Sequence, residues 1–354
     1  MVGLYENIGK IPQDTIGTPD MHFFVYESYL IFDHKKEKIV IVEDNIYSGR
    51  EEEEQKAALQ EVLADLKKQA VDEFSERDLH TLTFRNHLEE ATFKDMVTKA
   101  KKFIRQGDMF QCVLSQRFSA DISGKPLDFY RNLRITNPSN YLYFYDFGDY
   151  QIIGASPESL VSLKNGVVTT NPIAGTRPRG ANDQKDKDLS EELLSDVKEV
   201  AEHRMLVDLG RNDIGKIAEV GSVQVSKYME VEFFRYVMHL TSVVKGKLLS
   251  GLTGMDALKS TLPAGTVSGA PKIRAMKRIY ELEKEKRGIY AGAIGYLSAS
   301  GDMDFAIAIR TMIIKNQKAY VQAGAGIVYD SVPENEYYET INKAKAMTRI
   351  GEIQ

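Results

Sequence analysis

The 354-residue sequence contains no tryptophan and only one cysteine, Cys112, which excludes an intramolecular disulfide. It lacks the basic blocks and zinc-type spacings that indicate nucleic-acid binding, and its 46 basic and 51 acidic residues give a formal net charge of −5. No apolar run approaches the roughly 20 residues that span a bilayer. The N-terminus MVGLYENIGK has neither the charged start nor the apolar middle of a signal peptide. We therefore expect a cytoplasmic protein that binds neither nucleic acid nor a membrane.

Alternating apolar and polar residues at 21–44, either side of the charged turn DHKKEK, predict a β-hairpin, and helical spacing follows at 51–72. Further helical patterns cover 91–107, 127–135, 189–209, 253–261, 271–284 and 334–351. Strand patterns cover 109–118, 141–147, 150–155, 159–163, 167–173, 222–226, 289–299, 303–314 and 318–323. The strands come in hairpin-like runs instead of alternating singly with helices. We therefore expect an α+β fold, a two-layer sandwich of largely antiparallel sheets covered by helices.

The segment 73–88 is less regular than its neighbours. It predicts a boundary between a partial N-terminal region, residues 1–88, made of the hairpin and its helix, and a longer core, residues 89–354.

The stretch NPIAGTRPRG, residues 171–180, has the composition of an anion-binding loop. Gly175 can adopt a positive φ and let a ligand approach the backbone, while Arg177 and Arg179 can each meet a carboxylate or phosphate with two hydrogen bonds. The same glycines and prolines occur in ordinary surface turns, so this stretch alone leaves both interpretations open.

Two pairs of glutamates recur at helical spacing. Glu199 and Glu202 lie three residues apart, which places both carboxylates on one helix face. Near the end of the chain, Pro333 starts a helix in which Glu336 and Glu339 share a face in the same way. Two such pairs on facing helices would suit Mg²⁺, which prefers oxygen ligands and keeps waters or substrate oxygens in its shell. Solvated or salt-bridged acids are the alternative, since most charged helix faces are solvated.

Three other glycine-containing stretches give weaker signals. AGTVSGAPK, residues 264–272, resembles a phosphate loop without the Gly-Lys-Ser/Thr ending, although backbone N–H groups before the following helix could face an anion. QAGAGIVYDS, residues 322–331, carries an unspecific GAG after an apolar strand. GASPESL, residues 154–160, places Glu158 between two strands, where an acid is more often a turn residue than a catalyst.

Taken in order, the blocks PIAGTRPRG, KEVAEHRMLVDLGRND, LPAGTVSGAPK, GIYAGAIGY, FAIAIRT, QAGAGIV and PENEYYE resemble the chorismate-utilising enzymes, over residues 90–350. Ala174 stands where the para-aminobenzoate branch of that family carries a lysine. Gln111 stands where the isochorismate and salicylate branches carry a lysine that activates water. The resemblance therefore implies the anthranilate synthase branch, whose aminating component converts chorismate and ammonia to anthranilate and pyruvate, the first step of tryptophan biosynthesis. A para-aminobenzoate (aminodeoxychorismate) synthase component, or a truncated chorismate-binding module without activity, is the alternative.

The resemblance also implies roles for individual residues. Glu158 would protonate the departing C4 hydroxyl, which at neutral pH requires burial or neighbouring acids to keep it protonated. His239 would act when the C2 proton is lost. Substrate would be bound by Gly175, Thr176, Tyr290, Arg310, Gly324, Ala325 and Gly326, with Thr176 also counted among the catalytic residues. Mg²⁺ would be held by Glu202 and Glu339, with Glu199 and Glu336 acting directly or through waters. Arg177 and Arg179 would brace their loop.

A glutamine-hydrolysing site needs a nucleophilic cysteine with a histidine partner, and Cys112 lies in a strand pattern instead of a glycine-framed turn. The resemblance thus implies that a separate glutamine amidotransferase subunit supplies the ammonia. The family's tryptophan site combines an N-terminal motif with a segment that matches NPSNYLYFY, residues 137–145. Here Asn140, followed by Tyr141 and Leu142, replaces the common proline, and the N-terminal motif is expected to be missing. We expect weak or absent inhibition by tryptophan.

Overall fold

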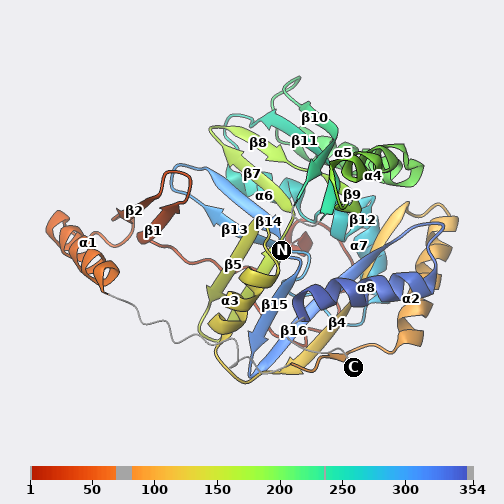
Figure 1. Ribbon diagram of the computed structural model, residues 1–354, viewed down its shortest axis with the longest axis horizontal. Coiled ribbons are helices and arrows are strands. Elements are labelled where there is room, and N and C mark those ends of the chain that lie inside the picture. The colour runs from red at the N-terminus through yellow and green to blue at the C-terminus, as the bar shows by residue number, and fades with distance from the viewer. Residues whose placement is uncertain (1, 69–81, 235–236, 349–354) are drawn as a thin grey trace. The chain divides into compact units, whose positions relative to one another are not determined.

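The computed structural model describes residues 2–68, 82–234 and 237–348 (Figure 1). Its internal contacts divide the chain into two units, Met1–Thr18 with Glu76–Gln354, and Pro19–Ser75. The division expected after residue 88 stays a prediction. Among the described helices, none combines the length and the apolar character that crossing a membrane requires.

The smaller unit contains β1 (Ser28–Asp33), β2 (Lys38–Glu43) and α1 (Glu52–Lys67). The two strands pair antiparallel, which confirms the predicted hairpin. Arg50 lies 3.3 Å from a carboxylate oxygen of Glu43 and 3.8 Å from one of Glu27, and so connects the segment before α1 to the hairpin. Residues 69–72 of the predicted helix lie outside the described residues.

In the described part of the larger unit, the first of two antiparallel sheets has seven strands. Its order is β10 (Gln224–Phe233), β11 (Val237–Lys247), β8 (Val167–Thr170), β7 (Ser159–Lys164), β14 (Met303–Ile307) and β13 (Ala293–Leu297), with β9 (Ile173–Pro178) paired to β11. The helices beside it are α4 (Asp183–Ser195), α5 (Val197–Gly215) and α6 (Gly254–Thr261) (Figure 1).

The second sheet also has seven strands in the described residues. Its order is β12 (Gly269–Ala270), β4 (Gln111–Asp121), β16 (Lys318–Ile327), β15 (Thr311–Lys315), β6 (Tyr150–Ser156) and β5 (Tyr141–Asp146), with β3 (Arg85–Asn86) paired to β4. Its helices are α2 (Glu90–Arg105), α3 (Pro126–Thr136), α7 (Lys272–Leu282) and α8 (Pro333–Thr348). Two 3₁₀ turns, η1 (Val2–Leu4) and η3 (Gly265–Val267), complete the elements used below.

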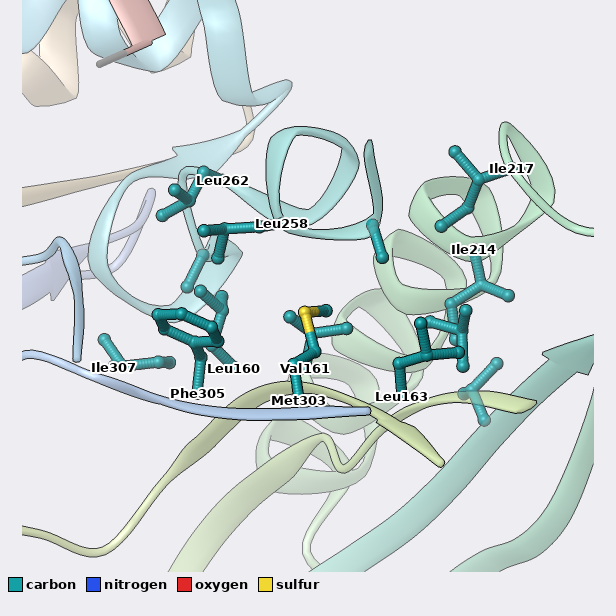
Figure 2. Packing of buried hydrophobic residues seen from close by; sticks show 14 of the residues in the cluster. Leu160, Val161, Leu163, Ile214, Ile217, Leu258, Leu262, Met303, Phe305 and Ile307 are labelled. Carbon is teal, nitrogen blue, oxygen red and sulfur yellow. The ribbon is translucent and has the colours of Figure 1, made fainter. Parts of the chain in front are cut away.

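The first sheet buries an apolar face under α5 and α6. Figure 2 shows Val161 of β7 and Phe305 of β14 on the strands below Leu258 of α6. These side chains, Ile307 of β14 and Ile214 of α5 are all buried in one cluster. Each large apolar side chain removed from water in this way contributes about 1.5–3 kcal/mol. The packing fixes α5, and with it the acids on that helix, against the sheet.

The second sheet is covered on one face by two groups of helices. Phe118 and Val321 pack with side chains of α3 and α8 in one cluster, while Cys112 and Leu114 pack with side chains of α2 and α7 in another. The neighbouring strands β4 and β16 therefore carry residues of both clusters.

The expected α+β fold of antiparallel sheets covered by helices is confirmed, but several predicted elements were wrong in extent. The strand predicted at 222–226 is the longer β10, and β11 was not predicted. The helix predicted at 189–209 is two helices, because Asp196 ends α4 and its carboxylate accepts hydrogen bonds from the backbone N–H groups of Lys198 and Glu199, at 3.0 and 3.1 Å, which starts α5. The strand predicted at 303–314 is β14 followed by β15, which belong to different sheets. Arg310, with a φ of 47°, lies in the connection.

Candidate active site

Residues 173–178, expected as part of a loop, form β9. The pairing of β9 with β11 shifts at Gly175, since His239 pairs with Thr176 and Leu240 pairs with Ala174. Gly175 is the extra residue of this bulge and has a φ of 65°, which favours glycine. A Cβ at Gly175 would lie 3.3 Å from a carboxylate oxygen of Glu199. The missing side chain therefore lets the strand approach the acids of α5.

Two arginines of this stretch are used within the protein. Arg177 donates hydrogen bonds to Glu192 at 3.1 Å and to Asp196 at 2.9 Å. Arg179 is paired with Asp186 and donates to the carbonyl of Phe234 at 2.9 Å. Both arginines brace the segment, as the sequence predicted.

His239 of β11 is held by its Nδ1 atom. This atom lies 2.9 Å from the carbonyl oxygen of Gly175 and 3.1 Å from the hydroxyl of Thr176. A carbonyl oxygen only accepts hydrogen bonds, so Nδ1 carries the hydrogen and Nε2 of the neutral ring is left to accept a proton. Burial lowers the pKa of His239, the hydrogen bond to Gly175 acts in the opposite direction, and the positive charge of Arg310 lowers the pKa further. The side chain is suited to act as a base.

Glu158 lies between β6 and β7 and is half-buried. Its backbone carbonyl accepts a hydrogen bond from Ile307 at 3.0 Å, and its Oε1 atom accepts one from the hydroxyl of Thr266 at 2.9 Å. Burial raises the pKa of Glu158 to about 7, while the Thr266 hydrogen bond and the charge of Lys343 act in the opposite direction. This carboxyl group can therefore hold a proton much closer to neutral pH than an ordinary glutamate does.

Tyr290 is buried beside the glycine-containing end of β16. A Cβ at Gly324 would lie 2.6 Å from the Tyr290 hydroxyl and 3.0 Å from the carbonyl oxygen of Leu114. Only glycine leaves this room, so the hydroxyl can reach the strand backbone. Burial raises the pKa of Tyr290 to about 12, which keeps the phenol protonated and able to donate. Ala325 and Gly326 continue the same strand, which pairs with β4.

The glutamates of each predicted pair influence each other. Burial raises the pKa of Glu202, and the negative charge of Glu199 on the same face of α5 raises it further. On α8, burial raises the pKa of Glu336, and the charge of Glu339 adds to that effect. Each pair is thus an unfavourable concentration of negative charge that a cation would relieve.

Two lysines lie close enough to these acids for their positive charges to act on them. The charges of Lys198 and Lys343 act on both Glu202 and Glu336, so the two pairs share neighbours. Lys343 also donates to Glu339 at 2.6 Å and to the carbonyl of Gly324 at 3.1 Å.

Across residues 2–68, 82–234 and 237–348, no three acidic, histidine or cysteine side chains converge closely enough to hold a metal ion. The acids nevertheless fit a divalent cation in donor chemistry, since they are carboxylates in two mutually repelling pairs. A cation would compete with Lys343 for Glu339.

Sequence reasoning missed the roles of Thr266 and Lys343. Thr266 lies in the stretch considered as a phosphate loop, an interpretation that the structure does not support. Gly269 and Ala270 pair with β4, and Lys272 is paired with Asp213. Thr266 and Glu158 instead line one cavity of about 50 Å³. The spacing of Lys343 four residues after Glu339 was a readable signal for an ion pair on α8.

The segment compared with a tryptophan site lies at the start of β5. Asn140 is exposed, Tyr141 donates to Asp304 at 3.0 Å, and Leu142 packs at the edge of the second sheet's core. These contacts leave the expected response to tryptophan a prediction.

Comparisons with known proteins match nearly the whole of this chain to one family. The family model described as chorismate binding enzyme matches residues 2–349. The chain is 56% identical over 350 residues to the anthranilate synthase component 1 of Lactococcus lactis subsp. lactis, covering 99% of this chain and 77% of the relative. It is 48% identical over 358 residues to that of Aquifex aeolicus, covering 100% of this chain and 72% of the relative.

Two solved structures of related proteins also resemble this chain. The crystal structure of anthranilate synthase component I from Streptococcus pneumoniae TIGR4 matches with a TM-score of 0.93 and 72% identity, over 99% of this chain and 78% of that one. The menaquinone-specific isochorismate synthase MenF from Escherichia coli matches with a TM-score of 0.72 and 25% identity, over 84% of this chain and 69% of that one.

Proposed function

This chain belongs to the family of chorismate binding enzymes, and from that premise we propose that it is the aminating component of an anthranilate synthase, converting chorismate and ammonia to anthranilate and pyruvate. The names of its relatives support this branch of the family. Ala174, buried in β9, supports it against the para-aminobenzoate branch, which is expected to carry a lysine there.

The observation that carries the proposal is the place of the Glu158 carboxyl group, which is hydrogen-bonded to Thr266 at 2.9 Å and has its pKa raised by burial. Ammonia forms the new bond to C2 of chorismate as the bond between C4 and its hydroxyl oxygen breaks. Glu158 gives its proton to that oxygen, which leaves as water. A glutamate at the ordinary value of 4.5 would be almost fully ionised at pH 7, whereas a pKa of about 7 supplies the acid at working pH.

In the second half of the reaction the C2 proton is removed and the bond between C3 and the enolpyruvyl oxygen breaks, which makes the ring aromatic. The enolpyruvate that leaves takes up a proton and becomes pyruvate. Nε2 of His239 is the base that this geometry favours, since Nδ1 is held by Gly175. Tyr290 and Arg310 would bind the enolpyruvyl carboxylate, for which a hydroxyl donor and a guanidinium are suited. Gly175, Thr176 and the segment Gly324 to Gly326 would line the ring.

The cofactor of this proposal is Mg²⁺, bound by Glu202 and Glu339 with Glu199 and Glu336 directly or through waters. When bound, it would neutralise the ring carboxylate of chorismate, which these acids alone would repel. Mg²⁺ would compete with Lys343 for Glu339, which accepts a hydrogen bond from that lysine at 2.6 Å.

The partner of this component would be a glutamine amidotransferase that supplies ammonia. The reaction would be the first step of tryptophan biosynthesis in the cytoplasm. The relatives' designation as component 1 and the single buried thiol, Cys112, support a separate ammonia-producing subunit.

The experiment is to mix the purified protein with chorismate, Mg²⁺ and excess ammonium at mildly alkaline pH, and to follow anthranilate fluorescence and pyruvate together. Both products should appear and should vanish with a chelator. Glutamine should not replace ammonium until a glutaminase partner is added. Chorismate consumed without pyruvate would indicate the aminodeoxychorismate reaction instead, and no consumption by folded protein would contradict catalysis.

A further inference from the structure

A buried ion pair, Glu283 with Arg287, lies between β4 and the 3₁₀ turn η3. The two guanidinium nitrogens Nε and Nη2 of Arg287 donate to the two carboxylate oxygens of Glu283 at 2.8 and 2.6 Å. Glu283 also accepts hydrogen bonds from the backbone N–H and the hydroxyl of Ser115, at 2.8 and 2.9 Å. The carboxylate is thereby fixed to β4, and it fixes the guanidinium in turn.

The remaining donors of Arg287 reach two separate segments of backbone. Nη1 donates to the carbonyl of Val267 at 2.7 Å, and Nη2 donates to the carbonyl of Val113 at 2.6 Å. Val267 is the last residue of η3, and the residue before it, Thr266, donates to Glu158. Arg287 therefore holds the turn that holds the proposed general acid.

The same guanidinium contacts Tyr290. Its central carbon lies 5.5 Å from the centroid of the tyrosine ring, a distance at which the cation and the aromatic face attract each other. One side chain thus touches both the turn beside Glu158 and the residue proposed to bind the enolpyruvyl carboxylate.

We propose that Arg287 is a positioning residue that sets the proton-donating geometry of Glu158 through Val267 and Thr266, and the placement of Tyr290 through its ring. The proposal rests on the proposed function. It assigns Arg287 no contact with the substrate.

The Thr266 hydrogen bond favours one oxygen of Glu158 as the proton donor. Because the hydroxyl donates to Oε1, the proton of the neutral acid is favoured on Oε2. A turn that shifts away would leave the proton on either oxygen and the carboxyl group free to rotate. The other charges facing Glu158 are Lys343 and the Asp213–Lys272 pair, which lines the same cavity.

The test compares Arg287→Lys, Thr266→Val and the double variant by kcat, KM for chorismate and the pH dependence of kcat. Thr266→Val should lower kcat about tenfold and leave KM unchanged. The alkaline limb should move to higher pH, because the lost hydrogen bond favours the ionised carboxylate. Arg287→Lys keeps the positive charge but cannot make the two parallel hydrogen bonds to Glu283. It should lower kcat by about tenfold to hundredfold, move the alkaline limb of the pH profile to higher pH, and also raise KM.

The double variant distinguishes an effect of Arg287 that reaches Glu158 through Thr266 from a general disturbance of the structure around the site. Its kcat should be no lower than that of the worse single variant, while the raised KM should persist, because Tyr290 is reached without Thr266. Arg278→Lys is the matched control, since Arg278 is also ion-paired, at 2.6 Å from Asp108, and lies over an aromatic ring, that of Phe103, but its hydrogen bonds go to Asp108 and Glu281. It should leave the pH limb in place.

If Arg287→Lys does not fold, Glu283→Gln provides the second variant, because it weakens the paired hydrogen bonds to Arg287 and keeps the arginine. It should move the limb in the same direction by a smaller amount. Additive losses of kcat, an unmoved alkaline limb, or an equal movement in Arg278→Lys would each overturn the inference while wild-type activity stands. A wild-type protein that forms no anthranilate would overturn the proposed function, and this inference with it.

Discussion

Replacing Glu158 with glutamine should inactivate the enzyme and stabilise the fold at the same time. The glutamine side chain keeps an oxygen that can accept the Thr266 hydrogen bond but carries no transferable proton. Loss of a general acid typically costs a factor of about 100 to 10,000 in rate. We therefore expect kcat to fall by at least about a hundredfold, with a smaller change in KM.

The gain in stability follows from the raised pKa of Glu158. In the folded chain this carboxyl group titrates at about 7 instead of 4.5, so between these values the native state binds more protons than the unfolded state. The contribution of Glu158 to stability therefore falls as pH rises through this window. A shift of that size corresponds to about 3 kcal/mol of cost once the group is ionised in both states. Glutamine, which does not ionise, avoids the cost.

Urea unfolding of the wild type and of Glu158→Gln at pH 5 and pH 8 measures this difference. The variant's advantage in the free energy of unfolding should be about 2–3 kcal/mol larger at pH 8 than at pH 5. Glu191→Gln, at an exposed position of α4, is the control and should show no such change with pH. An advantage that is the same at both pH values would refute the raised pKa, and near wild-type kcat would refute the role as acid.

Further predictions concern the metal, the bulge, the core and regulation. Glu202→Gln and Glu339→Gln should each raise the Mg²⁺ concentration for half-maximal rate by about tenfold or more, whereas Glu334→Gln, whose partner is Lys94, should not. Gly175→Ala should cost about 1–2 kcal/mol from its φ of 65° alone, seen in urea unfolding, and should lower kcat. Phe305→Ala should reduce the free energy of unfolding by about 3–5 kcal/mol. Micromolar tryptophan should leave the rate unchanged, and inhibition would contradict that expectation.

The sequence predicted the parts of the fold that depend on local periodicity. The hairpin β1–β2 and the helices α2 and α7 follow from the spacing of apolar residues, and the i, i+3 glutamates followed from helix geometry. The break between α4 and α5 was missed because Asp196 lies within a continuous helical pattern, and its capping role depends on backbone N–H groups that only the structure reveals.

The parts of the site built from distant segments could not be predicted from spacing. Residues 303–314 read as one strand because their apolar character continues through the connection between the sheets. Arg287 lies 174 residues from Val113, the residue whose carbonyl it bonds, and no local pattern relates such positions. Thr266 was hidden in a glycine-rich stretch whose composition also suits a phosphate loop.

Arg310 lies where the chain changes from one sheet to the other. Before it, β14 of the first sheet ends at Ile307, and directly after it β15 of the second sheet begins at Thr311. Its carbonyl accepts a hydrogen bond from Ala155 of β6 at 3.1 Å. A substrate bound by this residue would therefore add its binding free energy to the joint between two separately packed cores, so that occupancy of the site and cohesion of the larger unit rise together.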